Sequence, residues 1–505
     1  MSVAQRVAAP APAPGARSDG PPTAPGAGRF WPRLLPVLCA LAVTTRLPSF
    51  TRPLWNPDEG FLATEARMLA RGAVLYSTVV DRKPPLLPWL YQLCFGLFGD
   101  DSLLPVKILA VPAQLLTAVL LASLARRRWG ERAGRTAGVL YLLVSIGLDP
   151  EDAQAATFEV FMVPWTAAAM WCADRGRWSA AGLAVAGAVL TKQTGGAVLA
   201  PVLLLLCAHH RRAAGAGALA LGFVLPVAAV AWLTGPARLL FWTVTGSGSY
   251  ASAQGVLALA LSRAAFNAGV LCLGCAGLLI PVVVLLLTRR RVAPPELWLW
   301  TAASAVAVTT GFHFFGHYYL QLLPPLTLLG TSALCALPRP ASPPAIAGAV
   351  LTCGFFLIWG LTSHAPGLPH SLEVARAARE RTAPTDRVLF WGIHPEQYWF
   401  ADRQPAGHCL TAGLLTNYSG GRGPSRVGEA YGVPGTWPVL RRELSLRPPA
   451  LIVDDSRGKP YGPSRMPSLR AVLDRRYERV AVVDGAVFYA RRPGPPRPTT
   501  PGRAA

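Results

Sequence analysis

The sequence predicts an α-helical polytopic membrane protein, with about 11 transmembrane helices, a surface-lying first outer loop and a small C-terminal α/β domain. Hydrophobic residues make up 52% of its 505 residues, and charged residues only 15%. Apolar runs recur from residue 30 to residue 361, and short arginine clusters separate them. This combination is typical of integral membrane proteins.

The net charge of +22 could also indicate a nucleic-acid-binding protein. However, the basic residues lie in short clusters between apolar runs, which is the pattern that membrane orientation produces. We therefore expect a lipid bilayer and no nucleic acid as partner. The preference for Ala, Gly, Pro and Arg over Lys suggests a bacterial source.

Four regions follow from the composition. Residues 1–28 are mostly Ala, Pro, Gly and Ser and lack an apolar core, so they predict a disordered cytoplasmic tail and no cleaved signal peptide. We expect a transmembrane domain over residues 29–362, an extracytoplasmic domain over residues 363–492, and a disordered tail over residues 493–505.

The expected spans alternate so that the arginine clusters share one side of the membrane, in agreement with the positive-inside rule. Residues 180–190 and 197–208 are each too short to span the membrane. Together they predict a helical hairpin with Lys192 near its tip. The spans are 30–48, 103–125, 136–148, 158–173, 180–190, 197–208, 213–233, 263–288, 297–311, 319–337 and 345–361.

The first outer loop, residues 54–98, is unusually rich in charge. Asn56 or Asp58 can cap a helix that starts at Pro57, and Gly72 is a suitable end. Residues 76–80 predict an extended segment, and another helix follows from Leu86. The loop contains four basic residues, Arg67, Arg71, Arg82 and Lys83, against the trend of the other outer loops, so we expect an anionic ligand there. The alternative is a solvated loop with ordinary capping acids and interfacial arginines.

The C-terminal region predicts alternating helices and strands. Amphipathic or mixed segments indicate helices at 371–381, 394–401 and 469–477. Apolar runs indicate strands at 387–392 and 451–455, and the latter ends in Asp454 and Asp455. Asp484-Gly485 is a hairpin turn signal between strands at 479–483 and 486–490.

The polar groups that could carry chemistry fall on one side of the expected membrane. A carboxylate that deprotonates an acceptor, together with cations that neutralise a phosphate leaving group, is what glycosyl transfer from a lipid phosphate requires. The residues in question are Asp58, Glu59, Lys83, Asp149 to Asp152, Glu159, Lys192, His313 and His317.

Several of these residues also allow simpler interpretations. Glu159 begins an expected helix, where the helix dipole alone favours a carboxylate. Lys192 could extend toward lipid headgroups or contact a phosphate. His313 and His317 have the i, i+4 spacing that permits metal binding on a helix, but two histidines without a third ligand are more often interfacial or contact substrate. A divalent metal is therefore compatible with the sequence, and no cofactor is established.

At these residues the chain resembles the C-type glycosyltransferase superfamily, in the glycosyltransferase family 39 group. That group includes protein O-mannosyltransferases and the aminoarabinose transferases that modify lipid A. The resemblance covers residues 30 to about 360 and rests on Pro57-Asp58-Glu59, Lys83-Pro84-Pro85-Leu86, Phe158-Glu159, Leu190-Thr-Lys-Gln193 and His317-Tyr-Tyr-Leu-Gln-Leu-Leu-Pro324.

The resemblance implies an inverting transfer from a polyprenyl-phosphate sugar. Asp58, with Glu59 beside it, would be the general base or acceptor anchor, and Glu159 a second acid. Lys83 would lie near the donor phosphate or the acceptor, and Lys192 at the donor phosphate. We assign Arg82 to the phosphate as well, and His317 and Tyr318 to substrate binding.

One feature departs from the aminoarabinose enzymes: Phe158-Glu159 stands where they have Arg-x-Asp. The sequence therefore does not decide whether the acceptor is a lipid, a glycan or a protein. It also does not decide whether the sugar is a hexose or a pentose. We expect an enzyme of the inner (plasma) membrane in a bacterial cell envelope, with its active site on the extracytoplasmic face.

Two alternatives come from other classes. A transporter or flippase for a lipid-linked or anionic solute would more often show two matching halves with midplane breaks, and the sequence has no such repeat. A non-catalytic scaffold that presents the C-terminal domain would leave the basic residues of the first outer loop and Lys192 unexplained.

Overall fold

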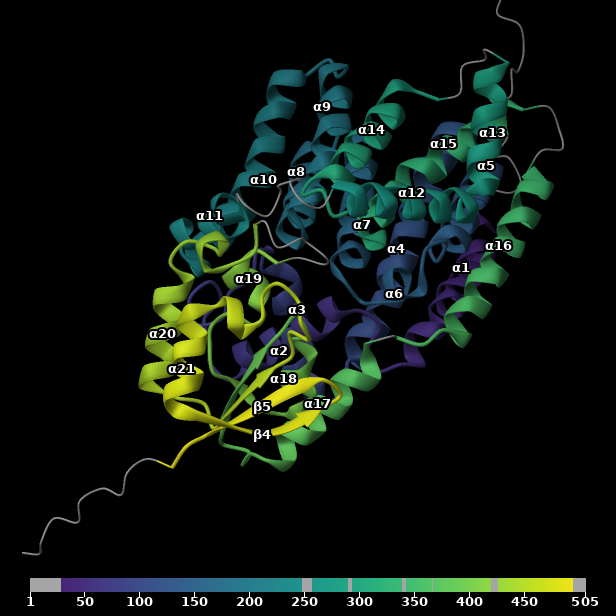
Figure 1. Ribbon diagram of the computed structural model, residues 1–505. Coiled ribbons are helices and arrows are strands. Elements are labelled where there is room, and N and C mark those ends of the chain that lie inside the picture. The colour runs from purple at the N-terminus through teal and green to yellow at the C-terminus, as the bar shows by residue number, and fades with distance from the viewer. Residues whose placement is uncertain are drawn as a thin grey trace, which may run out of the picture.

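The computed structural model describes residues 29–247, 257–288, 293–337, 342–365, 367–418 and 426–493. The expected tail at 1–28, nearly all of the tail at 493–505 and the arginine cluster at 289–291 lie outside these residues. The described chain forms a large helical region and a smaller α/β region beside it (Figure 1).

The helical region confirms the predicted fold class. Six helices are long and apolar enough to cross a membrane, and five shorter helices are also apolar. Large apolar side chains remain exposed on the outer helices, such as Trp232 and Leu351 at 83% and 75% exposure, as expected for surfaces that face lipid. The helices are α1 (Phe30–Arg46), α4 (Leu104–Trp129), α5 (Glu131–Val144), α7 (Phe158–Ala173), α8 (Trp178–Thr191), α9 (Leu199–Cys207), α10 (Arg212–Thr234), α11 (Pro236–Thr243), α12 (Leu257–Gly274), α13 (Ala276–Leu287), α14 (Pro295–Thr309), α15 (Leu323–Ala336) and α16 (Ser342–Thr362).

Short 3-10 segments complete several of these helices. The first, η2, extends α1. The turn η3 joins α8 to α9, as the predicted hairpin requires, and η5 leads into α15. Their bounds are η2 (Leu47–Phe50), η3 (Gln193–Val198), η4 (Thr245–Ser247) and η5 (Gly316–Leu322).

Ion pairs connect three of the predicted inner segments at one end of the helical region. Arg128, at the end of α4, contacts Asp174 after α7 at 2.8 Å and Glu296 at the start of α14 at 2.6 Å. Segments that are far apart in sequence therefore share one side, as the arginine pattern predicts.

One predicted span is different in the structure. Residues 263–288 were expected to be one helix, but α12 begins earlier, at Leu257, and a break at Cys275 separates it from α13. At this break Gly274 packs closely on another segment, and an added Cβ would lie 2.6 Å from the Cα of Gly147. A continuous apolar run does not reveal this contact.

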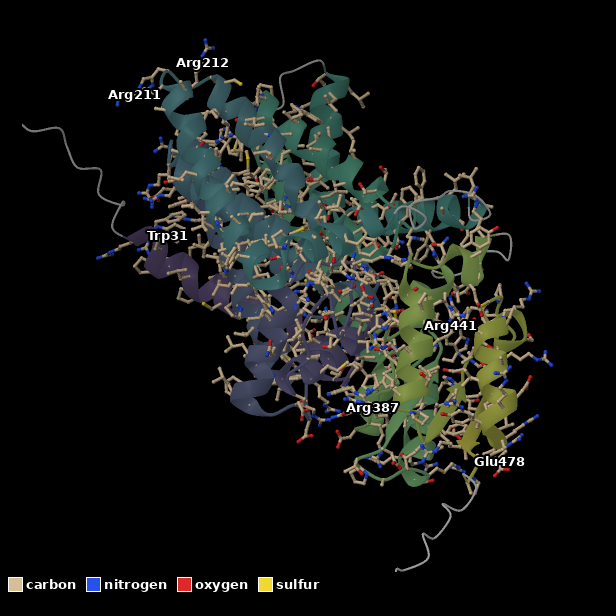
Figure 2. The ribbon with its side chains drawn as sticks, turned by 90° about the vertical axis from the view of Figure 1, so that its left-hand side faces the viewer. Trp31, Arg211, Arg212, Arg387, Arg441 and Glu478 are labelled. Carbon is tan, nitrogen blue, oxygen red and sulfur yellow. The ribbon has the colours of Figure 1, made fainter. Side chains whose placement is uncertain are left out.

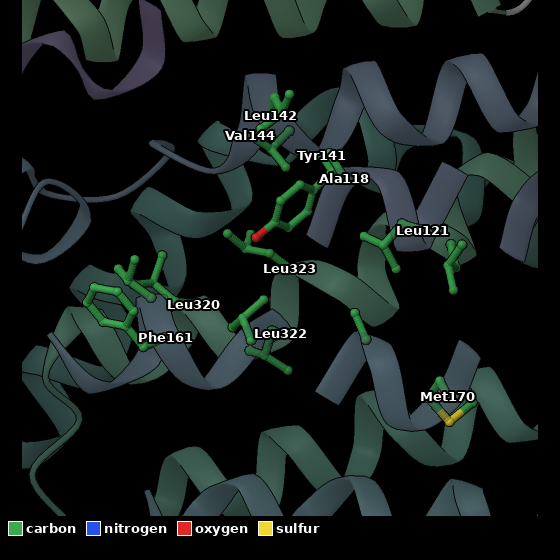
Figure 3. Packing of buried hydrophobic residues seen from close by; sticks show 14 of the residues in the cluster. Ala118, Leu121, Tyr141, Leu142, Val144, Phe161, Met170, Leu320, Leu322 and Leu323 are labelled. Atoms are coloured by element: carbon green, nitrogen blue, oxygen red, sulfur yellow. The ribbon is translucent and has the colours of Figure 1, made fainter. Parts of the chain in front are cut away.

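The packed centre of the helical region is built from α4, α5, α7, η5 and α15. Figure 3 shows Leu121, Tyr141, Phe161 and Leu323 within this cluster. The hydroxyl of Tyr141 donates to Oε1 of Gln114 at 2.6 Å, which satisfies two buried polar groups. This packing fixes the ends of α7 and η5, from which the site residues project.

The first outer loop contains two helices, α2 (Pro57–Ala70) and α3 (Leu86–Phe98). Oδ1 of Asn56 accepts from the backbone N–H of Asp58 at 2.9 Å, which confirms the expected cap. The expected extended run at 76–80 is wrong: the chain turns there, with a bridge between Leu75 and Val79 and with Tyr76 at φ 63°.

The C-terminal region has a five-stranded sheet in the order β2-β1-β3-β5-β4. Strand β1 pairs parallel with β2 and β3, and β5 pairs antiparallel with β3 and β4. The predicted strands are present, whereas α19 and α20 were not foreseen. The elements are α17 (Leu368–Glu380), β1 (Arg387–Trp391), α18 (Glu396–Ala401), β2 (Gln404–Pro405), α19 (Ala412–Thr416), η7 (Glu429–Tyr431), α20 (Thr436–Leu446), β3 (Leu451–Asp454), η8 (Pro463–Arg465), α21 (Pro467–Arg476), β4 (Tyr477–Val483) and β5 (Ala486–Arg491).

The α/β region packs directly on the first outer loop through α18 and α2 (Figure 1). Thr64 Oγ1 donates to the carbonyl of Pro395 at 2.9 Å, and Arg67 Nη1 donates to the carbonyl of Trp399 at 2.9 Å. Gly60 allows the close approach, because an added Cβ would lie 2.9 Å from the Cα of Glu396. The contact fixes the helix that carries Asp58.

Candidate active site

A cavity of about 930 Å³ opens where the first outer loop, the ends of the membrane helices and the α/β region meet. Six of the eight predicted site residues line it: Asp58, Arg82, Lys83, Lys192, His317 and Tyr318. Glu59 and Glu159 do not. The α/β region adds a wall that includes Ile393, Pro395, Thr411, Leu414 and Tyr418.

Asp58 presents a carboxylate to this cavity from the first turn of α2. Its side chain is 45% exposed, so it can reach a bound molecule. Oδ2 of Asp58 lies 3.8 Å from Nε2 of His317. The side chain lies at the N-terminal end of α2, the positive end of the helix dipole.

His317 is held between two acids. Its Nδ1 lies 2.6 Å from Oδ1 of Asp152, while its Nε2 faces Asp58. The ring also stacks on Phe315, with centroids 5.7 Å apart. Gly316 allows these side chains to approach closely, because an added Cβ would lie 2.9 Å from Oδ1 of Asn267. The imidazole is therefore fixed in orientation beside Asp58.

The acidic loop that carries Asp152 is anchored by a buried arginine that sequence reasoning missed. Nη1 of Arg46 donates to the carbonyl of Ala153 at 2.6 Å, and Nη2 donates to that of Gln154 at 2.8 Å. Asp152 belongs to the short helix α6 (Pro150–Ala153) between these contacts and the cavity. The only signal in the sequence was an arginine at the end of the first apolar run.

Glu59 is fully buried and points away from the cavity. Its carboxylate accepts the backbone N–H of Trp55 at 2.7 Å and that of Ala156 at 2.8 Å. It thereby ties the start of α2 to the segment that leads into α7. This geometry favours a positioning role for Glu59 over the direct role that we expected.

Glu159 and Lys192 form a buried ion pair. Lys192 is only 3% exposed, and its Nζ lies 4.0 Å from the ring centroid of Tyr318. Lys192 thus points into the protein and does not extend toward lipid headgroups. Lys192 lines the cavity, and its charge is balanced by Glu159, which the cavity does not reach.

Lys83 is the cation most available to an anion. Its Nζ lies 5.7 Å from the ring centroid of Phe158, and it forms no ion pair with an acid among the residues that the structure describes. The corner that carries it is fixed by its backbone: Tyr76 donates to the carbonyl of Lys83, and Gln193 to that of Arg82, each at 2.6 Å. Arg82 and Lys83 are thereby directed along the same wall.

Two further charged residues line the cavity and were not predicted as site residues, Asp81 and Arg263, whereas Glu151 belongs to the acidic loop at 149–152 that was expected on this side. Burial raises the pKa of Asp81 to about 6, although Lys83 and the N–H of Arg82 oppose the shift. Burial, with Asp152 and Asp149 nearby, raises the pKa of Glu151 to about 7. In the sequence, Asp81 stands directly before Arg82 and Lys83, and this position was the signal that could have identified it as a site residue.

The histidine pair is not arranged as a metal site. His313 lies before η5 and not on a helix, and the Phe315 ring stacks between the two imidazoles at 5.7 Å from each. Among the described residues, no group of three or more His, Cys, Asp and Glu side chains is close enough to hold a metal ion.

Comparisons with known proteins agree with this architecture. Residues 82–234, from the Arg82-Lys83 corner to the end of α10, match the family model of dolichyl-phosphate-mannose-protein mannosyltransferases. No curated protein gives a match.

Two solved structures have the same fold over nearly the whole chain. ArnT from Cupriavidus metallidurans in the apo state is 18% identical with a TM-score of 0.62, covering 92% of this chain and 98% of that chain. The structure of the same protein bound to undecaprenyl phosphate is 16% identical with a TM-score of 0.60 over the same shares. The predicted resemblance to the C-type glycosyltransferases is therefore confirmed.

Proposed function

We propose that this chain, which has the C-type glycosyltransferase fold, transfers a hexosyl or pentosyl group from a polyprenyl-phosphate donor to an acceptor hydroxyl or amine. The observation that carries the proposal is that Asp58 and Lys83 face one cavity at the mouth of the membrane helices. An acid that can take a proton and a cation that can meet a phosphate are thus available to one bound molecule.

The donor phosphate would lie against Lys83 and Arg82. Lys83 has no acid partner among the described residues, so a phosphate would supply the missing counter-charge. The polyprenyl chain can remain among the apolar helices, since the cavity opens at their ends. The structure of ArnT bound to undecaprenyl phosphate supports a donor of this class in this fold.

The reaction would proceed in one displacement. The acceptor oxygen or nitrogen forms a bond to C1 of the sugar while the bond from C1 to the phosphate oxygen breaks. Asp58 takes the acceptor proton, and the bonding electrons leave with the phosphate as polyprenyl phosphate. Lys83 and Arg82 stabilise the charge that develops on this leaving group.

His317 and Glu159 would support this chemistry without being consumed in it. His317 is fixed by Asp152 and can position Asp58 or a sugar hydroxyl. Glu159 holds Lys192 beside Tyr318, so that the wall next to the sugar is rigid and its charges are balanced.

The acceptor would enter beneath the α/β region, which supplies one wall of the cavity. A lipid, a glycan or a protein acceptor fits a site that is open to the membrane surface on this side. We propose that this side is extracytoplasmic in an inner (plasma) membrane, because the arginine clusters gather at the opposite end.

The proposal is tested by sugar transfer from radiolabelled polyprenyl-phosphate donors to a membrane extract. Wild type should form a labelled product, and Asp58→Asn should lower its rate by about 10²-fold or more. Asp101→Asn removes a carboxylate from the same region outside the cavity and should behave like wild type.

Two results would overturn the proposal. One is that no donor in a broad panel is consumed by the correctly inserted protein. The other is that Asp58→Asn and Asp101→Asn transfer sugar equally well. Either result would favour the transporter alternative, which can be examined by uptake of the same donors into vesicles.

A further inference from the structure

A second cavity lies at the arginine-rich end of the helical region, away from the candidate active site. Its volume is about 350 Å³, and it forms where the loop after α7 meets the turn between α9 and α10. Figure 2 shows Arg211 and Arg212 at the tip of this end, far from Arg387, Arg441 and Glu478 of the α/β region. None of the residues described around this cavity is acidic.

One wall of this cavity holds a buried donor without an acceptor. Trp178 is only 6% exposed, and its indole Nε1–H has no hydrogen-bond partner among the described residues. Gly215, also in the wall, keeps space beside this atom, since an added Cβ would lie 3.0 Å from Nε1. A buried N–H is costly without an acceptor, so a ligand oxygen is expected there.

The remaining polar groups of the wall are also suited to an anion. The rings of His209 and His210 lie with centroids 4.4 Å apart, and His209 packs edge-on against Trp178 at 5.3 Å. Arg211 lines the cavity and precedes the first turn of α10, where the helix dipole is positive. A tryptophan, two histidines and an arginine therefore line one space.

We propose that this cavity binds the phosphate of an anionic phospholipid, from the leaflet that the arginine-rich end faces. The apolar surface below the cavity favours a lipid over free phosphate. Leu203 on α9 and Leu221 on α10 are 41% and 58% exposed, so acyl chains can lie along these helices while the headgroup occupies the cavity. Basic cavities at helix ends are suited to anionic headgroups.

Native mass spectrometry of the full chain, released from phosphatidylcholine nanodiscs with and without phosphatidylglycerol, tests this site. Wild type should retain phosphatidylglycerol in preference to phosphatidylcholine. Trp178→Phe removes the N–H together with part of the ring, Arg211→Gln removes the charged guanidinium, and each should weaken this binding by about tenfold. Arg212→Gln, an adjacent exposed arginine that does not line the cavity, should retain the lipid like wild type.

Equal retention by all four proteins would overturn the proposal, since the lipid would then be held by general charge alone. Displacement of phosphatidylglycerol by an equal concentration of inorganic phosphate would show that free phosphate is the ligand, and it would overturn the lipid assignment. If Trp178→Phe does not fold, the comparison of Arg211→Gln with Arg212→Gln decides the question, because both side chains are exposed. None of these results depends on sugar transfer.

Discussion

Nε2 of His317 lies 3.8 Å from Oδ2 of Asp58, although the two residues come from segments more than 250 positions apart in sequence. The contact joins the first outer loop to the start of η5. It places an imidazole, already fixed by Asp152, next to the acid that we propose as general base.

His317→Gln should lower the rate of transfer by about 10²-fold while leaving donor affinity nearly unchanged, because His317 orients Asp58 and does not meet the phosphate. Single-turnover transfer at saturating donor measures this rate. His364→Gln, at an exposed histidine outside the cavity, serves as the control. A fall in affinity with an unchanged rate would place His317 at the donor instead.

Glu59→Gln should act mainly on stability. The carboxylate accepts two backbone N–H groups in a buried place, and an amide has only one oxygen to offer. We expect a loss of about 1.5–3 kcal/mol, seen as a lower thermal unfolding midpoint in detergent. An unchanged midpoint together with abolished transfer would instead restore the direct catalytic role.

The ion pair of Glu159 and Lys192 predicts a non-additive result. Glu159→Gln leaves a buried lysine without its partner and should destabilise the protein by about 3–5 kcal/mol. Adding Lys192→Met should recover most of the stability but not the transfer activity. Additive losses of stability in the double variant would contradict the pairing.

Binding of polyprenyl phosphate should weaken as pH rises from about 5 to 8. The pKa of Asp81 is raised to about 6 and that of Glu151 to about 7, so both are protonated at the lower pH and ionised at the higher one. Ionisation adds two negative charges to a cavity that must hold an anion. Asp81→Asn with Glu151→Gln should flatten the profile in a titration of affinity against pH, and an unchanged slope would exclude these two groups.

Gly60→Ala should separate the α/β region from the first outer loop. The added Cβ has no room against Glu396, so α2 must shift and with it Asp58. We expect slower transfer and faster proteolysis of the α/β region. Gly96→Ala, where an added Cβ meets nothing within 4 Å, is the matched control.

Much of this architecture could be predicted, because membrane spans leave long apolar runs and the strands of the α/β region leave short ones. The grouping of Asp58, Lys83 and His317 could also be predicted, since charges beside a span must face water or a ligand. The break at Cys275 could not, because the apolar run is continuous there and does not reveal that Gly274 packs on Gly147.

The direction in which a charged side chain points was the least predictable feature. Asp58 and Glu59 are neighbours in sequence, yet one faces the cavity and the other binds backbone N–H groups. Helical geometry turns consecutive residues by about 100°, so only the packing around α2 decides which acid is available. The roles of Arg46 and Asp81 also depend on contacts between distant segments.

The most direct test of the account is the dissociation constant of polyprenyl phosphate for four proteins: wild type, Lys83→Met, Asp58→Asn and Arg71→Met. Lys83→Met should weaken binding by about tenfold or more, since it removes a charge at the phosphate. Asp58→Asn should bind at least as tightly as wild type while failing in transfer. Arg71, already paired with Asp402 outside the cavity, should be replaceable without effect. Equal binding by Lys83→Met and Arg71→Met would contradict the assignment of Lys83 to the donor phosphate.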